Sequence, residues 1–371
     1  MRPTEFARTT EPGAAGLEPV SERAEGRTGP VQAPKVTVAV PTLAAGEVLE
    51  ACLRALESQT VDEFEVVVID NSGTGRVQAS AHVSPRVRPR FRVIANESNV
   101  GFGAAVNQAF RESNASYLAT LNDDAVADPF WLETLLADAE AHPRTGMFAS
   151  EVRLAGTGTL DSAGMLIASD GSSKQRGHGA PPAHLADAND ALFASGSAAL
   201  YRRAMLEDVG LFDESFFLYC EDTDLGLRAQ WAGWGCRYVP GAIVEHQYSH
   251  SAGRASPLKA YYVERNRLYT IVKNFPARML LVAPFASIAR YFWHVSTLIS
   301  GHGKAAEYRD EGHSAAMLPW LVIRANLAAL FRLPALLAAR HRIRATRRIT
   351  PAEFRTLLER HSITVRQVAA L

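Results

Sequence analysis

Apolar residues along positions 35–121 form short runs that alternate with segments of helical spacing. The runs at 35–40, 64–69, 91–94 and 117–121 predict β-strands, the first of them ended by Pro41. The run at 64–69 is almost wholly apolar, which is typical of a parallel strand buried on both faces. Segments 48–58 and 99–113 predict the intervening helices. This alternation of strands and helices predicts a doubly wound α/β domain.

The alternation continues less regularly to about residue 275. Asp128 and Pro129 predict the start of a helix whose apolar residues, Phe130 and Trp131 among them, face the sheet. Further strands are expected at 147–152, 198–201, 236–239 and 243–245, and a helix at 221–231. Residues 153–194 are rich in Gly, Ala and Ser and predict a loop with short strands.

Residues 1–34 are dominated by Pro, Gly, Ala, Glu and Arg and show no apolar period. Such a composition predicts a disordered leader, and no apolar run of signal-peptide type interrupts it. The main folded domain is therefore expected over residues 35–275.

The last part of the chain contains two apolar stretches, 279–300 and 318–339, each about long enough to span a bilayer. Arg290, His294, Arg324 and Arg332 lie within them, which makes spanning costly. Aromatic and arginine residues among aliphatic ones are typical of helices in a membrane interface, and the arginines at 340–348 suit anionic lipid headgroups. The alternative is a helical appendage over 276–371 that packs on the main domain or on a second subunit.

Composition narrows the class of protein. Among 371 residues, Lys plus Arg and Asp plus Glu both number 39, so no net charge favours a nucleic-acid partner. The three cysteines form no metal-type pair, which favours a reducing compartment. We expect a cytoplasmic protein, peripheral on the inner face of the cell membrane if residues 279–348 contact a membrane surface.

Candidate chemistry gathers in two acidic stretches, 121–125 and 219–225, and in His246. The first stretch follows an apolar run, and the carboxyl ends of such strands are where open α/β sheets bind ligands. Hard divalent cations need carboxylate oxygens and usually substrate phosphates as well. The second stretch offers a separate carboxylate that can act as a base. The three elements predict a metal–diphosphate site with a catalytic base, against the alternative of an acidic loop, a helix N-terminus and a buried histidine.

Several segments in this order resemble the motifs of family 2 glycosyltransferases of the GT-A, nucleotide-diphospho-sugar transferase fold. The matching segments are 38–42 (Val-Ala-Val-Pro-Thr), 68–72 (Val-Ile-Asp-Asn-Ser), 99–107 (Asn-Val-Gly-Phe-Gly-Ala-Ala-Val-Asn), 121–124 (Leu-Asn-Asp-Asp), 195–196 (Ser-Gly), 221–225 (Glu-Asp-Thr-Asp-Leu), His246 and 265–269 (Arg-Asn-Arg-Leu-Tyr). The resemblance covers about residues 35–275, and segment 99–107 is most similar to the rhamnosyltransferase-like and galactofuranosyltransferase-like branches.

The resemblance implies an inverting, metal-dependent transfer of a sugar to a hydroxyl of a lipid-linked or cell-surface glycan, as in cell-wall or polysaccharide biosynthesis. The favoured donor is dTDP-rhamnose, and the alternative is a UDP-hexose or UDP-galactofuranose. Asp222 matches the general base, with Glu221 as its rival, and the helix dipole predicts an ionised Asp222. Asp224 is expected to cap or orient the helix. Asp124 and His246 match the ligands of Mn²⁺ or Mg²⁺.

The other expected contacts follow the same motifs. Residues expected to bind the nucleotide sugar are Pro41, Thr42, Asp70, Asn99, Gly101, Gly103, Asn107, Asn122 and Asp123, and those expected to bind the acceptor are Ser195 and Gly196. Asn122 departs from the family pattern, which has Asp at this position of its Asp-x-Asp motif.

Two other classes of protein share this kind of sheet. A nucleotidyltransferase would carry a basic, Gly-rich loop after the first strand, but segment 41–46 has no basic residue. A non-catalytic carbohydrate-binding protein would have lost the base or a metal ligand, whereas Asp124, Asp222 and His246 are all present.

Overall fold

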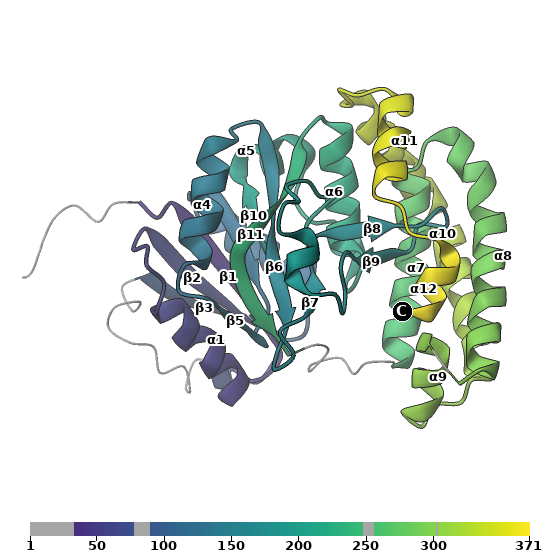
Figure 1. Ribbon diagram of the computed structural model, residues 1–371, viewed down its shortest axis with the longest axis horizontal. Helices are drawn as coiled ribbons and strands as arrows, with labels where there is room; N and C mark the ends of the chain where they lie inside the picture. Colours follow the sequence, from purple (N-terminus) through teal and green to yellow (C-terminus); the bar gives the residue numbers. More distant parts are fainter. Residues whose placement is uncertain (1–32, 78–89, 248–255, 302) are drawn as a thin grey trace, which may run out of the picture. The chain divides into compact units, whose positions relative to one another are not determined.

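The computed structural model describes residues 33–77, 90–247, 256–301 and 303–371. The leader predicted for residues 1–34 therefore lies almost wholly outside the described residues. Within the described residues, nine strands form one mixed sheet (Figure 1). The strands are β1 Val36–Thr42, β2 Phe64–Asp70, β3 Phe91–Ala95, β4 Tyr117–Leu121, β5 Ala125–Ala127, β6 Thr145–Leu154, β7 Leu160–Ser162, β10 Ala198–Arg202 and β11 Gly235–His246.

The strand order is β3-β2-β1-β4-β10-β6-β11-β5, with β7 paired to β6. Strands β3, β2, β1 and β4 run parallel, as the alternating pattern predicts. β10 is antiparallel to β4 and β6, and β11 is parallel to β6. Thr42 pairs with Asp70, so the carboxyl ends of β1 and β2 meet at one edge, next to the segment that follows β4.

Five helices accompany these strands within the described residues: α1 Glu47–Glu57, α3 Phe102–Arg111, α4 Trp131–Ala141, α5 Arg203–Val209 and α6 Glu221–Trp231. The inward faces of α1 and α4 bury residues such as Leu53, Leu56 and Leu135 against the sheet. Burial of one apolar face against a sheet is the main stabilisation of such helices.

Several predicted boundaries are wrong. β1 continues through Pro41 to Thr42, because Pro41 lies near the strand end and still takes up extended backbone there. α4 begins at Trp131, and Phe130 is 57% exposed instead of facing the sheet. The two strands predicted at 236–239 and 243–245 are one strand, β11, with a register shift between Val239 and Ile243.

Residues 153–194 contain short strands, as predicted, and two of them, β8 Met165–Ile167 and β9 Ser173–Gln175, form a separate hairpin. The rest of the chain is helical: α7 Pro257–Asn274, α8 Ala277–Ile299, α9 Gly303–Asp310, α10 Met317–Ala345, α11 Pro351–Arg360 and α12 Val365–Ala370. Helices α7–α12 lie together beyond the β8–β9 hairpin, away from β1–β3 (Figure 1). The helical appendage expected at the C-terminal end is thus present.

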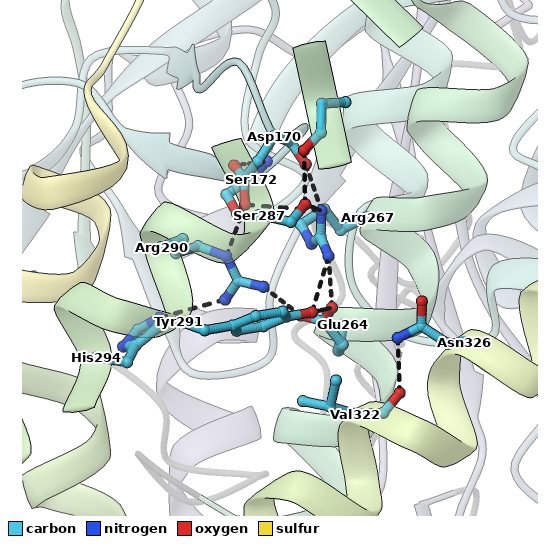
Figure 2. A network of polar contacts seen from close by, with 11 residues as sticks. Asp170, Ser172, Glu264, Arg267, Ser287, Arg290, Tyr291, His294, Val322 and Asn326 are labelled. Carbon is cyan, nitrogen blue, oxygen red and sulfur yellow. Dashed lines mark hydrogen bonds and ion pairs between the residues drawn. The ribbon is translucent and has the colours of Figure 1, made fainter. Parts of the chain in front are cut away.

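A buried cluster of charges joins the β8–β9 hairpin to α7 and α8 (Figure 2). Asp170, in the hairpin turn, accepts a 2.6 Å hydrogen bond from Arg290 Nε and lies 3.6 Å from Arg267. Glu264 accepts from both arginines at 2.5 Å. Arg290 of α8 therefore faces the protein interior, which explains how this apolar helix accommodates an arginine.

Candidate functional site

A pocket of about 420 Å³ opens at the carboxyl edge of the parallel strands. Its walls come from β1, the segment after β4, the β8–β9 hairpin, α6 and α7. Eleven of the residues expected in the site line it: Pro41, Thr42, Asn99, Asn122, Asp123, Asp124, Ser195, Gly196, Glu221, Asp222 and His246. The remaining four, Asp70, Gly101, Gly103 and Asn107, lie outside the lining.

Asp124 and His246 lie side by side at one end of the pocket. The distance from His246 Nε2 to Asp124 Oδ1 is 3.1 Å. Pairing of β5 with β11, which sets His246 opposite Ala125, brings the two residues together. This three-residue strand was not expected from the sequence, because its apolar run is too short to give a strand pattern.

Asp161 of β7 holds the other nitrogen of the same imidazole. Its Oδ2 lies 2.9 Å from His246 Nδ1, and its Oδ1 lies 3.1 Å from His178 Nδ1. Burial opposes the charged form of Asp161, but its hydrogen bonds with His178 and His246 outweigh burial and lower its pKa. Burial likewise lowers the pKa of His246, while Asp124 and Asp161 together raise it to about 9.

This arrangement fits a divalent cation that is shared with a ligand. A carboxylate that fixes Nδ1 turns Nε2 toward Asp124 Oδ1 and Asn122 Nδ2, 3.1 Å and 3.2 Å away, as in carboxylate–histidine–metal sites. Asp124 Oδ1 is buried and has no hydrogen-bond donor, although it contacts His246 Nε2. Within the described residues, no group of three His, Cys, Asp or Glu side chains could hold a metal ion. Phosphate oxygens of a ligand would therefore have to complete the coordination of the cation.

The nucleotide end of the pocket is set by β1 and β2. Thr42 Oγ1 donates a 2.6 Å hydrogen bond to Asp123 Oδ2, so this carboxylate is held against the end of β1. Asp70 is fully buried, and its Oδ1 accepts from Ser72 N–H at 2.9 Å. Its Oδ2 has no hydrogen-bond partner. A buried carboxylate oxygen of this kind can accept an N–H from a nucleobase.

Three of the expected nucleotide contacts have packing roles in the structure. Asn107 is buried, and its amide bonds to Phe212 and Glu214 through both its oxygen and its nitrogen. A Cβ at Gly101 would lie 2.3 Å from Phe217 O, and one at Gly103 would lie 3.0 Å from Phe212 Cβ. These positions fix α3 against residues 212–217. Sequence reasoning missed this role because it depends on a segment about a hundred residues away.

Glu221 and Asp222 begin α6 and line the opposite side of the pocket. Asp222 Oδ2 accepts from Gly196 N–H at 3.1 Å, and Oδ1 accepts from Thr223 N–H at 2.6 Å. Burial raises the pKa of Asp222, and these hydrogen bonds partly offset that rise. Burial and the charge of Asp222 raise the pKa of Glu221 to about 8. Burial thus opposes the ionised form of Asp222 that the helix dipole favours, and an ionised Asp222 stays a prediction.

Asp224 has a structural role, but it caps no helix. It is fully buried, pairs with Arg228 and Lys273 at 2.8 Å each, and accepts from Asn274 Nδ2. Burial opposes its charge, but the two cations lower its pKa. It thus ties α6 to α7 below the acidic pair.

Comparison with known proteins identifies the family. The family model of Glycosyl transferase family 2 matches residues 37–210, and that of Glycosyl transferase family group 2 matches residues 183–340. The N-acetylglucosaminyl-diphospho-decaprenol L-rhamnosyltransferase of Mycobacterium tuberculosis (strain CDC 1551 / Oshkosh) is 31% identical over 251 residues, which cover 61% of this chain and 80% of that protein. The chain belongs to glycosyltransferase family 2.

Other similar proteins support the same family and fold. The O-antigen biosynthesis protein RfbC of Myxococcus xanthus is 27% identical over 245 residues, which cover 62% of this glycosyltransferase and 19% of RfbC. GalNAc-T7 with UDP, GalNAc and Mn²⁺ has a TM-score of 0.56 at 13% identity, over 70% of this chain and 51% of that one. S. aureus TarS 1-349 in complex with UDP-GlcNAc has a TM-score of 0.51 at 18% identity, over 88% and 90%. The GT-A fold is confirmed.

This glycosyltransferase has pocket residues that the sequence analysis did not single out. Ser173, Lys174, Gln175 and Lys259 line the pocket, and Asp161 of β7 lines it beside His246. The β8–β9 hairpin, α7 and β7 bring these residues in. No motif marks them, because the hairpin strands have three residues each and their spacing along the chain carries no periodic signal.

Proposed function

We propose that this glycosyltransferase moves a sugar from a nucleoside diphosphate to an acceptor hydroxyl, with a divalent cation and with inversion at the anomeric carbon. The observation that carries the proposal is the pairing of Asp124 Oδ1 with His246 Nε2 at 3.1 Å in the same pocket as Glu221 and Asp222. A cation–diphosphate end and a base end are what a direct displacement needs.

In this mechanism Asp222 accepts the proton of the acceptor hydroxyl while the hydroxyl oxygen attacks the anomeric carbon. The bond from that carbon to the diphosphate oxygen breaks, and the nucleoside diphosphate leaves with the electron pair. One displacement with one base inverts the configuration. Asp124 and His246 would hold the cation, which when bound neutralises charge on the departing diphosphate. An imidazole ligand favours Mn²⁺ over Mg²⁺.

We propose dTDP-rhamnose as the donor and a lipid-linked glycan as the acceptor. The support is the 31% identity to a mycobacterial rhamnosyltransferase whose name gives a diphospho-decaprenol acceptor. The buried Asp70 Oδ2 supports a thymine or uracil base, because either offers an imide N–H. A UDP-hexose or UDP-galactofuranose is the alternative donor.

We also propose that α8 and α10 rest on an anionic bilayer surface. Leu281, Phe285, Ile288, Phe292, Val295 and Ile299 of α8 recur every three or four residues and are 56–82% exposed. Neither α8 nor α10 contains an acidic residue, and α10 carries Arg324, Arg332, Arg340, Arg342 and Arg344. An apolar face with cations and no acids matches a surface of anionic lipids.

An alternative for helix α10 is that it spans the membrane. Among the described residues it is the one helix long and apolar enough to cross a bilayer, by length and composition. It packs along α7, and its Arg340 donates to Val272 O at 2.8 Å. These contacts favour a helix that lies on the protein, with its exposed side toward the lipid.

The function is tested by incubating the purified full chain and Mn²⁺ with a panel of nucleotide sugars: dTDP-rhamnose, UDP-galactofuranose and UDP-hexoses. Release of nucleoside diphosphate and the rise in melting temperature identify the donor. The proposal expects one nucleotide sugar to stabilise the protein in a Mn²⁺-dependent way, and Asp124→Ala to lose that dependence. If the stabilisation of Asp124→Ala by a nucleotide sugar still responds fully to Mn²⁺, the assignment of the metal site is wrong. No response to any nucleotide sugar would remove the proposed function.

A further inference from the structure

The loop that precedes the acidic pair, residues 216–220, has an unusual backbone. Phe217, Tyr219 and Cys220 have positive φ angles of 65°, 68° and 65°, which non-glycine residues rarely adopt. Phe217, with ψ of −58°, is the centre of a γ-turn closed by a 2.8 Å hydrogen bond from Leu218 N–H to Phe216 O. Such strained backbone persists only where surrounding contacts over-determine it, and it clusters at functional sites.

This loop connects the start of α3 to the acidic pair of α6. On one side, Phe217 O accepts a 2.9 Å hydrogen bond from Phe102 N–H at the start of α3, and Gly101 leaves room for that oxygen. On the other side, Cys220 is the N-cap of α6 and directly precedes Glu221. Three residues of the loop also line the pocket: Leu218, Tyr219 and Cys220. The conformation of the loop therefore sets where the acidic pair begins.

Asn266 of α7 supplies the contacts that hold the loop. Its Nδ2 lies 2.9 Å from Phe216 O, 2.8 Å from Leu218 O and 2.7 Å from Tyr219 O. These three carbonyls converge on one amide nitrogen because the γ-turn and the positive φ angles rotate them inward. Asn266 is fully buried and absent from the pocket lining, and its amide is engaged by protein groups on both sides, so it offers no group to a substrate.

The orientation of the Asn266 amide is fixed from the other side. Arg265 Nε donates a 2.8 Å hydrogen bond to Asn266 Oδ1, which requires the NH₂ group to face the loop. The same arginine donates through one Nη to Ser215 O at 2.9 Å and to Phe216 O at 2.7 Å. Neighbouring residues of α7 thus grip the loop together, and Asn266 makes the contacts nearest the acidic pair.

We propose that Asn266 is a positioning residue for transfer: by binding three carbonyls of the strained loop 216–220, it holds Glu221 and Asp222 where the acceptor hydroxyl must meet the base. The inference rests on the proposed function, because it concerns the same acidic pair. It predicts that loss of the Asn266 donors harms turnover far more than donor binding, since Asp124, His246 and the β1 end of the pocket do not contact Asn266.

The test uses the full chain with Asn266→Ala, which removes both N–H donors, and Asn266→Ser, which puts one O–H donor in their place. We expect kcat of Asn266→Ala to fall about a hundredfold, the scale of a misplaced catalytic group, while KM for the donor changes less than about threefold. Asn266→Ser should recover part of kcat. Hydrogen–deuterium exchange over residues 217–222 should speed up in Asn266→Ala.

Asn274→Ala is the matched control. Asn274 is an equally buried asparagine of the same helix, and it bonds to Asp224 instead of the loop. It should lower the melting temperature and leave both kcat and exchange over 217–222 near the parental values. A parental kcat in Asn266→Ala, or an equal loss of kcat in Asn274→Ala, overturns the inference. If Asn266→Ala does not fold, the kcat of Asn266→Ser decides, and a parental value there is equally fatal.

These outcomes are distinct from failure of the proposed function. If the parent protein turns over no nucleotide sugar, the proposed function is wrong. If the parent and Asn266→Ala are equally active, only the positioning role of Asn266 is wrong.

Discussion

Adjacent carboxylates at the start of α6 have different surroundings, and this difference assigns their roles. Asp222 accepts hydrogen bonds from two backbone N–H groups, which favour its charged form. Glu221 is buried, and its Oε2 has no hydrogen-bond partner, so its charged form has no comparable support. Because two buried like charges oppose each other, Asp222 is the member of the pair that ionises first and accepts the proton.

We therefore predict that Asp222→Asn lowers kcat by about a hundredfold or more, in line with loss of a general base. Donor affinity should change little, because the base addresses the acceptor hydroxyl. Glu221→Gln should reduce kcat less. Kinetics of both variants beside the parent measure this, and near-parental turnover in Asp222→Asn with an inactive Glu221→Gln would reassign the base to Glu221.

The pH profile of the same variants gives a second, independent readout. Burial raises the pKa of Asp222, so activity should decline on acidification at a higher pH than for an ordinary aspartate. Glu221, with a pKa raised to about 8, is still neutral in the pH range where Asp222 ionises, so Glu221→Gln should leave this acid limb in place. An acid limb that moves to lower pH in Glu221→Gln would mean that Glu221 ionises before Asp222 and would contradict this order.

Helix α8 is amphipathic, although most of its residues are apolar. Its polar residues Arg290, Tyr291 and Ser287 turn inward to the cluster in Figure 2, and its exposed side carries the apolar stripe. Arg290 also lies 3.2 Å from His294 Nε2, and burial together with the charge of Arg290 lowers the pKa of that histidine to about 4. His294 therefore stays neutral near neutral pH and adds no charge to the helix.

We expect the double variant Phe285→Asp with Phe292→Asp to lose binding to vesicles containing anionic lipid, by about tenfold or more. Each exposed aromatic side chain that enters the lipid contributes roughly 1.5–3 kcal/mol, and aspartate adds repulsion. Sedimentation with phosphatidylserine vesicles measures the effect. High salt should partly weaken binding of the parent protein to these vesicles.

The control for this experiment is Phe130→Asp, a comparably exposed phenylalanine of the sheet domain at 57% exposure. It should bind vesicles as the parent does. Release of nucleoside diphosphate from the donor should be unchanged in all variants. If the intact chain ignores anionic vesicles, the surface of α8 and α10 does not bind a membrane.

Across the whole molecule, the sequence predicts regular elements better than it predicts contacts. Strand β2 and helix α6 follow their apolar patterns closely, because each pattern covers several residues with one period. The mixed part of the sheet, with β10 between β4 and β6, does not follow from any local pattern. It depends on pairing between distant strands, which single-sequence periodicity does not encode.

The candidate site shows the same limit. Motif resemblance located Asp124, His246 and Asp222, and the structure brings them into one pocket. Asp161 and Asn266 act through partners 85 and about 50 positions away, so no spacing along the chain marks them. Asn107 lies in a motif, but its side-chain amide hydrogen-bonds to the backbone of Phe212. An amide can pair with buried backbone groups as readily as with a ligand.

At the same whole-molecule scale, a buried charge cluster joins the β8–β9 hairpin to the C-terminal helices. It consists of Glu264, Asp170, Arg267 and Arg290. The stability of the packing between these two parts should therefore depend on pH. Burial opposes the charge of Glu264, but the two arginines outweigh it and lower its pKa to about 2, from an ordinary value of 4.5. A lowered pKa contributes stability that is present above pH 4.5 and is lost as pH falls toward 2. Glu264 should contribute about 3 kcal/mol at neutral pH.

Glu264→Gln should therefore lower the free energy of unfolding by about 3–5 kcal/mol at pH 7, since it leaves two buried arginines with one carboxylate. The difference from the parent should shrink as pH falls from 4.5 toward 2, because the parent loses the same charge by protonation. Urea denaturation at several pH values measures this. Glu207→Gln, at a 58% exposed carboxylate that pairs with Arg203 at i,i+4, is the control and should change stability by less than about 0.5 kcal/mol. A difference between Glu264→Gln and the parent that stays constant from pH 7 to pH 2 would mean that the lost packing of the side chain, and not its charge, joins the two parts.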